Sequence, residues 1–188
     1  MARDTSEVAS RAEILTFGHS NHDEAEFLDL LGGAGVELLA DVRANPRSRY
    51  PQFNGSSLSD SLKEAGIRYV QLGPQLGGRR EPAPDSRNLA LPEGPFRGYA
   101  DHMQGEVFAD GIARLEELAR DQRTAIMCAE ADWRSCHRRL ISDALVGRDS
   151  RVLHVGPDGS LSEHELTDFA VVADGEITYP EPQTSLDV

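Results

Sequence analysis

Hydrophobic runs and amphipathic stretches alternate along most of the chain. Five short apolar runs predict buried strands, at residues 14–17, 36–42, 67–72, 124–128 and 152–155. Between these runs, apolar residues recur three and four positions apart, which is typical of helices with one buried face. The repeated strand–helix order predicts an α/β fold: a single three-layer, Rossmann-like domain with a mainly parallel sheet of about five strands.

The two ends of the chain depart from this pattern. Residues 1–12 are polar, and we expect them to be disordered or frayed. Residues 13–166 carry the α/β pattern, and residues 167–188 form a C-terminal extension. Within the extension, residues 170–179 place an Asp-Gly pair between β-forming residues, which predicts a hairpin followed by a loose tail.

Capping residues predict where two of the helices begin. Asn21, with Glu24 three residues later, predicts a capping box before the first helix. Ser135 predicts the start of a helix that has Cys136 in its first turn, where free N–H groups and the helix dipole stabilise a thiolate. The periodicity of this helix places His137 on its inward face.

Composition narrows the class of protein. The chain has 188 residues, 39% of them hydrophobic, which is enough for one domain with a core. The net charge of −13 disfavours binding to nucleic acid through overall charge. No apolar run approaches the roughly 20 residues that span a membrane. The beginning of the sequence lacks the apolar segment of a secretory signal, and only two cysteines are present, so we expect a cytoplasmic chain.

Residues that can carry chemistry follow four of the predicted strands. Because parallel strands end at one edge of a sheet, we expect these residues to share one rim. They are His19 and Ser20; Asp41, Arg43 and Arg47; Gly77, Gly78 and Arg79; and Cys128, Glu130, Cys136, His137 and Arg138. Eighteen of the 19 basic residues are arginine, and several lie in these loops, which indicates a local anion site in an acidic chain.

We assign these residues provisional roles. A cysteine where a strand meets a loop is a candidate nucleophile if a histidine or an arginine lowers its pKa. The catalytic candidates are Cys128, Glu130, His137, His19 and Asp41, and the substrate-binding candidates are Ser20, Arg43, Arg47, Gly77, Gly78, Arg79 and Arg138. The structural alternatives are a buried apolar cysteine, a core histidine bonded to a carboxylate, and arginines in surface ion pairs.

Two other kinds of site are open to the same segment. Cys128, Cys136 and His137 can ligate a divalent metal, although their spacing is not that of a zinc finger. A divalent metal therefore stays an open alternative, and no cofactor is assigned. Cys128 and Arg134 have the spacing of the phosphate loop of cysteine phosphatases. The carboxylates of Glu130 and Asp132 between them would repel a phosphate.

Four blocks of sequence resemble a family of bacterial and archaeal proteins described as domain of unknown function 488. These are residues 16–20 (TFGHS), residues 41–53 with their Asp-Val-Arg and Pro-Gln-Phe triplets, residues 76–78 (LGG), and residues 128–138 with Cys-x-Glu and Cys-His-Arg. The match spans about residues 14–155, and its last block is the most specific. The resemblance implies an α/β sandwich and the position of a site, without implying a particular reaction.

Three functions are compatible with these features. The first is an enzyme with a Cys/His/Arg site that acts on a small anionic substrate, phosphate-bearing or nucleotide-like. The second is a nucleotide or nucleic-acid binding module in which Arg47, Arg49, Arg79 and Arg80 contact phosphates and Tyr50 or Phe53 stacks on a base. The third is an interaction domain with scattered rim residues. We favour the enzyme, with no preference for an oligomeric state.

Overall fold

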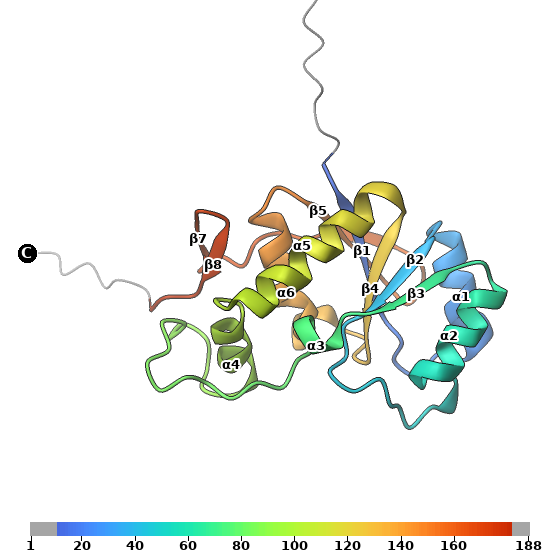
Figure 1. Cartoon of the computed structure of the whole chain (residues 1–188), viewed down its shortest axis with the longest axis horizontal. Coiled ribbons are helices and arrows are strands. Elements are labelled where there is room, and N and C mark those ends of the chain that lie inside the picture. Colours follow the sequence, from blue (N-terminus) through green and yellow to red (C-terminus); the bar gives the residue numbers. More distant parts are fainter. Residues whose placement is uncertain (1–10, 182–188) are drawn as a thin grey trace, which may run out of the picture.

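The computed structural model describes residues 11–181, in which a central sheet is covered by helices on both faces (Figure 1). The strands of the main sheet are β1 (Glu13–Gly18), β2 (Leu38–Asp41), β3 (Arg68–Gln71), β4 (Thr124–Cys128), β5 (Arg151–Val155) and β6 (Leu161–Glu163). Their order is β3-β2-β4-β1-β5-β6, and all neighbours are parallel except β5 and β6. The predicted three-layer α/β fold is therefore confirmed, with an antiparallel sixth strand beyond the expected five.

Six α-helices and two short 3-10 turns connect the strands. The α-helices are α1 (Glu24–Gly33), α2 (Gly55–Glu64), α3 (Gly73–Leu76), α4 (Pro95–His102), α5 (Glu106–Asp121) and α6 (Arg138–Val146). The 3-10 turns are η1 (Pro51–Phe53) and η2 (Trp133–Ser135). No helix among residues 11–181 combines the length and the apolar character needed to cross a lipid bilayer.

The sheet separates two hydrophobic cores. On one face, Phe27 and Leu31 of α1 and Leu62 of α2 pack on the strand side chains that point to this face. On the other face, α4, α5 and α6 cover the sheet, and the buried stripe of α5 includes Ile112 and Leu115. Because side chains alternate between faces along a strand, Cys128 points into the second core while Met127 points into the first.

The register of the parallel strands brings the functional segments to one edge. Gly18 at the end of β1 pairs with Cys128 at the end of β4, and Asp41 at the end of β2 pairs with Met127 and Gln71. Strand β4 is inserted between β1 and β2, so the segment after Cys128 lies between the ends of these two strands. The predicted convergence at the carboxyl edge is therefore confirmed.

Two predicted helix starts are wrong, and each error has a local cause. The capping box of α1 is formed by Asp23 and Glu26, not by Asn21 and Glu24, because the side chain of Asp23 accepts the N–H of Glu26 at 2.8 Å. The helix assigned to start at Ser135 starts at Arg138. Asp132 caps the short turn η2 instead, and Cys136 follows it in extended backbone.

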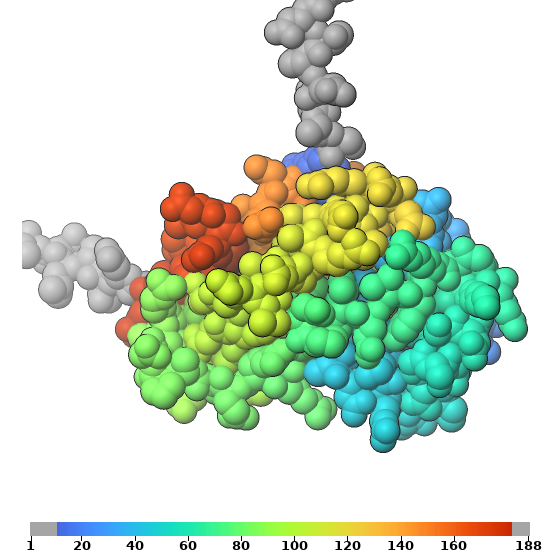
Figure 2. Space-filling model, viewed as in Figure 1, coloured from blue at the N-terminus to red at the C-terminus, as the bar shows by residue number. Residues whose placement is uncertain are grey.

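The predicted C-terminal hairpin is confirmed. Strands β7 (Val171–Ala173) and β8 (Glu176–Thr178) are antiparallel, and Asp174 and Gly175 between them both have positive φ, as a tight primed turn requires. The space-filling view shows this hairpin, in red, against the green segment around α4 (Figure 2). The expected frayed N-terminus and loose tail fall largely on residues 1–10 and 182–188, outside the described residues.

A buried chain of polar side chains fastens the C-terminal extension to α6. The hydroxyl of Thr16 donates to Nδ1 of His154 at 2.7 Å, Nε2 of His154 donates to Nδ1 of His164 at 2.9 Å, and Nε2 of His164 donates to Asp143 at 2.9 Å. Asp143 also accepts the hydroxyl of Tyr179 at 2.7 Å. Burial of His154, followed by the neighbouring His164, lowers the pKa of His154 to about 3, so the His154 imidazole is neutral at physiological pH.

Candidate thiol site

A pocket of about 340 Å³ opens at the carboxyl edge of β2 and β4. It lies between the loop after β2, the loop before α4 and the segment that joins β4 to α6. Its lining residues are Arg43, Ala44, Asn45, Arg47, Gly78, Arg79, Pro95, Phe96, Tyr99, Cys128, Ala129, Glu130, Ser135, Cys136 and His137. Eight of the sequence-predicted site residues line this pocket: Arg43, Arg47, Gly78, Arg79, Cys128, Glu130, Cys136 and His137.

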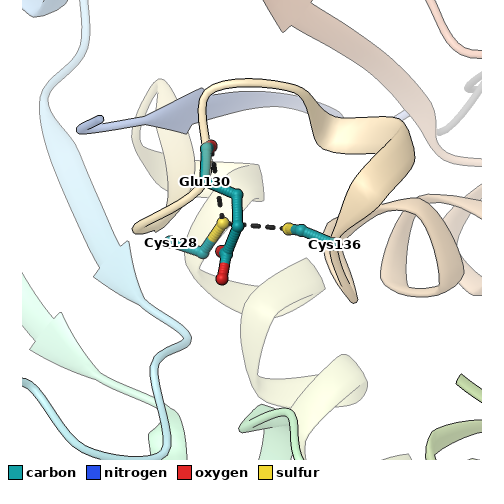
Figure 3. Close-up of side chains that lie close together, drawn as sticks. All are labelled: Cys128, Glu130 and Cys136. Carbon is teal, nitrogen blue, oxygen red and sulfur yellow. Dashed lines mark hydrogen bonds between the residues drawn. The ribbon is translucent and has the colours of Figure 1, made fainter. Parts of the chain in front are cut away.

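The two cysteines of the chain face each other at the floor of the pocket. The sulfur atoms of Cys128 and Cys136 are 2.9 Å apart, and both thiols are free (Figure 3). Cys128 lies at the end of β4 and is 0% exposed, whereas Cys136 lies between η2 and α6 and is 4% exposed. The two sulfurs therefore share one site but occupy different environments.

Cys136 is the more acidic of the two thiols, and its sulfur contacts Arg138. The backbone N–H and the Nε of Arg138 each donate to Sγ of Cys136 at 3.3 Å. Burial raises the pKa of a thiol, but hydrogen bonds from Cys128 and His137 and the charge of Arg138 outweigh it and lower the pKa of Cys136 to about 5. Burial, followed by the hydrogen bond to Cys136, raises the pKa of Cys128 well above its ordinary value. Cys136 is therefore the thiol of the pair that loses its proton more readily.

The predicted stabilisation of a Cys136 thiolate thus has a different cause from the one expected. Cys136 is outside α6, so it is not part of a helical first turn. The adjacent N–H of Arg138 still reaches the sulfur, and the guanidinium of the same residue adds a full positive charge. Arg138 itself is 1% exposed and does not line the pocket, so its side chain binds Cys136 and is not available to bind substrate.

A glycine at the end of β1 allows the segment after Cys128 to close over this pair. His19 and Ser20 donate their backbone N–H groups to the carbonyls of Cys128 and Ala129, each at 3.0 Å. A Cβ on Gly18 would lie 1.9 Å from the carbonyl oxygen of Glu130 and 2.9 Å from the guanidinium of Arg138. The close approach requires glycine, because any side chain would push the Glu130 carbonyl away from Arg138.

His137 borders the pocket with one nitrogen available. Its Nε2 donates to the carbonyl of Val42 at 2.9 Å, so Nδ1 is the ring nitrogen left to exchange a proton with the pocket. A Cβ on Gly78 would lie 2.9 Å from this Nδ1, so the glycine permits the close fit of the loop against the imidazole. The ring of Tyr99 lies 5.3 Å from that of His137 and fixes it from the α4 side.

Glu130 is the exposed carboxylate of the site. One of its carboxylate oxygens lies within 4.8 Å of both sulfurs (Figure 3). Partial burial raises its pKa, but a hydrogen bond with Cys128 and the positive charge of Arg138 reverse this and lower the pKa below its ordinary value. Glu130 is therefore ionised next to the thiols.

Asp41 acts on the site through Arg43. The Arg43 guanidinium donates to both carboxylate oxygens of Asp41, with Nε at 2.9 Å and Nη2 at 2.5 Å. Tyr69 donates its hydroxyl to the same carboxylate at 2.8 Å, and Arg43 also donates to the carbonyl of Phe53 at 2.8 Å. Asp41 is 0% exposed and does not line the pocket, so its geometry is that of a residue that positions Arg43.

Two other arginines at the pocket are uncommitted. Arg47 and Arg79 are exposed, and neither makes a hydrogen bond or ion pair through its guanidinium with another residue of the described range 11–181. In contrast, the guanidinium of Arg49 lies 4.9 Å from the ring centre of Tyr50. Arg47 and Arg79 are therefore the cations available to an anion that enters the pocket.

His19 and Ser20 line a neighbouring hollow that shares Arg47 and Glu130 with the pocket. The His19 ring stacks on Phe53 with ring centres 4.3 Å apart. Burial, followed by the positive charge of Arg43, lowers the pKa of His19 to about 4, so it is neutral at physiological pH. Phe53 is 0% exposed under this ring and is unavailable to stack on a base.

The donor set fits a metal ion poorly. Cys128, Cys136 and Glu130 bring two sulfurs and a carboxylate oxygen within 4.8 Å of one another. However, the guanidinium of Arg138 already occupies one side of Cys136, and a second cation there would be repelled. The third metal candidate of the sequence, His137, does not belong to this group of three residues.

Some pocket residues carried no signal in the sequence. Phe96 and Tyr99 belong to α4 and line the pocket, but neither was a candidate site residue. Gly77, which was predicted to bind substrate, is buried against the backbone of Ala44 and Gly73 and does not line the pocket. The most useful missed signal was Ser135-Cys136-His137-Arg138, since the arginine two residues after a cysteine can reach back to its sulfur.

These features define an α/β domain with a pair of thiols in a polar pocket at the carboxyl edge of its sheet. The chain belongs to the family described as domain of unknown function DUF488, whose model matches residues 24–145. The matched segment contains α1 to most of α6, including both cysteines. No curated protein and no solved structure matches the chain significantly.

Proposed function

We propose that this chain is an enzyme that uses a cysteine thiolate to act on a small anionic substrate. The observation that carries the proposal is the contact of Cys136 Sγ with the backbone N–H and the guanidinium of Arg138. The thiolate is the nucleophilic form of cysteine. With a pKa of about 5, Cys136 is in this form at neutral pH without the help of a general base.

The pocket favours a substrate with negative charge. Arg47 and Arg79 stand at its wall without partners in the described range, and planar guanidinium groups bind carboxylates and phosphates in two-point contacts. A volume of about 340 Å³ suits a small molecule. We therefore infer a phosphate-bearing or nucleotide-like substrate, or another anion of that size.

The other groups have roles that follow from their positions. Cys136 attacks the substrate, because its sulfur is the one in contact with Arg138. It therefore replaces Cys128, the candidate nucleophile assigned from the sequence. Glu130 and Nδ1 of His137 accept and return protons, and Arg43, held by Asp41, supplies a fixed charge at the pocket wall. Two free thiols are consistent with a reducing compartment such as the cytoplasm.

A pair of alkylating reagents tests the site. Iodoacetate and iodoacetamide carry the same leaving group and differ in charge. Relative to a small free thiol, Cys136 should prefer iodoacetate by about threefold or more. The double variant Arg47→Gln, Arg79→Gln should lose this preference. Arg120→Gln, an exposed arginine on the far end of α5, is the matched control and should keep it.

A measurement of turnover tests whether the chain is an enzyme. A panel of small phosphate esters, acyl phosphates and nucleotides is incubated with the wild-type chain and with Cys136→Ser. We expect turnover of at least one member by the wild type and none by the variant. Undiminished turnover by Cys136→Ser, or no preference for iodoacetate in the wild type, would contradict the proposal.

A further inference from the structure

We propose that Cys136 and Cys128 form a redox pair that reduces small disulfides carrying negative charge, with Cys136 attacking and Cys128 resolving. This inference rests on the proposed function, because it uses the same thiolate and the same pocket, and it names the substrate class. It also gives a role to Cys128, which the proposed function leaves unused.

The distance between the sulfurs is the first support. They are 2.9 Å apart, so a disulfide bond requires them to approach by only about 0.9 Å. Cys136 lies in extended backbone between η2 and α6, and its side chain is not part of a regular helix or strand. A shift of this size is therefore local to the segment that joins β4 to α6.

The different environments of the two thiols are the second support. Thiol–disulfide exchange needs an attacking thiolate and a second thiol that resolves the mixed disulfide. Cys136 touches Arg138 and lies closer to solvent, whereas Cys128 is 0% exposed and its nearest polar contacts are Cys136 and, at 3.9 Å, the carbonyl of Glu130. A disulfide in the pocket therefore meets the more exposed Cys136 first, and Cys128 lies within reach of the sulfur of Cys136.

The reaction balances without a cofactor. The thiolate of Cys136 attacks one sulfur of a disulfide RSSR, forms a Cys136–S–SR bond and releases RS⁻. The sulfur of Cys128 then attacks Sγ of Cys136, the Cys128–Cys136 bond forms, and the proton of Cys128 leaves with the second RSH. Glu130, within 4.8 Å of both sulfurs, is positioned to carry this proton. A second dithiol from solution reduces the pair and completes the cycle.

The surroundings favour this chemistry over the two alternatives for the same residues. Glu130 and Asp132 lie between Cys128 and Arg134 and would repel a phosphate enclosed by this segment itself, as in the loop of a cysteine phosphatase. Arg138 would repel a metal ion at Cys136. The same Arg138 stabilises the sulfur of Cys136 as a thiolate, both when it attacks the substrate disulfide and when it leaves as the second dithiol reduces the pair.

The charge of the substrate follows from the pocket wall. Arg47 and Arg79 lie beside the route to Cys136, and neither is neutralised by an acidic side chain in the described residues. Three disulfides of similar size test this: dithiodiglycolate is anionic, hydroxyethyl disulfide is neutral, and cystamine is cationic. We expect the wild-type chain to react fastest with dithiodiglycolate and slowest with cystamine.

The experiment mixes each disulfide with the reduced full chain and measures the released thiol and the mass of the intact protein. The wild type should release two thiols per chain and lose the mass of two hydrogens. Cys128→Ala should release one thiol and keep the mixed disulfide on Cys136. Cys136→Ala should release none at about pH 6, where an ordinary thiol is protonated. Circular dichroism verifies the fold, and Cys128→Ser provides a second variant in case Cys128→Ala does not fold.

Each other outcome overturns the inference. A wild type that stops at the mixed disulfide shows that Cys128 does not resolve it. If the two thiols bind zinc tightly and do not react with any of the disulfides, the pair is a metal site and the redox inference is wrong. Parallel labelling with iodoacetate separates the two proposals: rapid labelling of Cys136 without an internal disulfide overturns the redox pair alone. Failure to label Cys136 overturns the proposed function as well.

Discussion

The helix α6 contributes to two buried polar clusters that differ in how fully their groups are paired. In its second turn, Asp143 accepts hydrogen bonds from His164, Thr167 and Tyr179, and the chain continues through His154 to Thr16. At its start, Arg138 holds Cys136 beside a pocket. The first cluster is closed to solvent, and the second is open on the pocket side.

This difference in pairing distinguishes a cluster that stabilises the fold from one that can react. In the histidine–aspartate cluster, each imidazole nitrogen has a partner, as is usual for buried polar groups with a structural role. In the thiol cluster, a thiolate, Nδ1 of His137 and the guanidinium groups of Arg47 and Arg79 retain bonding capacity toward the pocket. Groups with unused capacity beside a cavity are the ones that can bind and react.

Asp143→Ala should give the largest effect on stability. It removes the acceptor for four hydrogen bonds and leaves Tyr179, His164 and Thr167 with unpaired donors. We expect the free energy of unfolding in urea to fall by about 3–5 kcal/mol. Asp110→Ala, an exposed aspartate of α5, is the control and should change it by less than about 0.5 kcal/mol. Equal losses in both variants would contradict a structural role for the cluster.

Arg138→Gln should affect reactivity most. Without the guanidinium, the pKa of Cys136 should rise, and the rate of its alkylation by iodoacetamide at about pH 6 should fall by about tenfold or more. The rate is measured by mass spectrometry of the intact chain. Arg134→Gln, a neighbouring exposed arginine that stacks on Trp133, should leave the rate within about twofold. A rate unaffected by Arg138→Gln would show that this arginine does not stabilise the thiolate.

The two clusters should respond to pH in different windows. The pKa of His154 falls from 6.5 in the unfolded chain to about 3, so the unfolded state binds more protons and stability rises with pH between these values. The pKa of Cys136 falls from 9.0 to about 5, so its contribution rises with pH from about 5 to 9.

Urea titrations at a series of pH values distinguish these contributions. In Cys136→Ser, the rise in unfolding free energy above about pH 6.5 should disappear while the rise at lower pH remains. In His154→Gln, we expect the lower part to shrink and the upper part to remain. Loss of the upper part in His154→Gln would contradict the assignment of the two windows.

Gly78→Ala should have the smallest effect. The added methyl group would lie 2.9 Å from Nδ1 of His137, so the loop or the imidazole must shift by a few tenths of an ångström. We expect a loss of about 1 kcal/mol in stability and a few-fold change in the alkylation rate of Cys136. Gly32→Ala in α1, where a Cβ meets nothing within 4 Å, is the control and should not lower stability. If the two variants behave alike, His137 is not held by this contact.

The edge of the sheet at which the site lies could be predicted from the sequence, but the pairing of its groups could not. Apolar runs ending at His19, Asp41 and Cys128 imply a shared rim, since parallel strands end together. That Arg43 is bound to Asp41 depends on which of many acidic partners is closest in space. The contact of Arg138 with Cys136 could not be predicted either. It depends on the short turn η2, after which α6 begins only at Arg138.

The choice of nucleophile was also beyond the sequence. In the sequence, Cys128 and Cys136 both lie next to predicted loops, and both have arginines within a few residues. Only the structure shows that Cys128 points into the core below α6 and that the Arg138 guanidinium contacts Cys136. Burial and contact with a cation shift the pKa of a thiol in opposite directions, and their balance is a property of three-dimensional position.

The most direct test of the thiolate assignment is the pH profile of iodoacetamide alkylation, with the modified residue identified by peptide mapping. Modification at Cys136 with an apparent pKa of about 5 is the predicted result. Modification at Cys128 first, or an apparent pKa near the ordinary thiol value of 9.0, would contradict it.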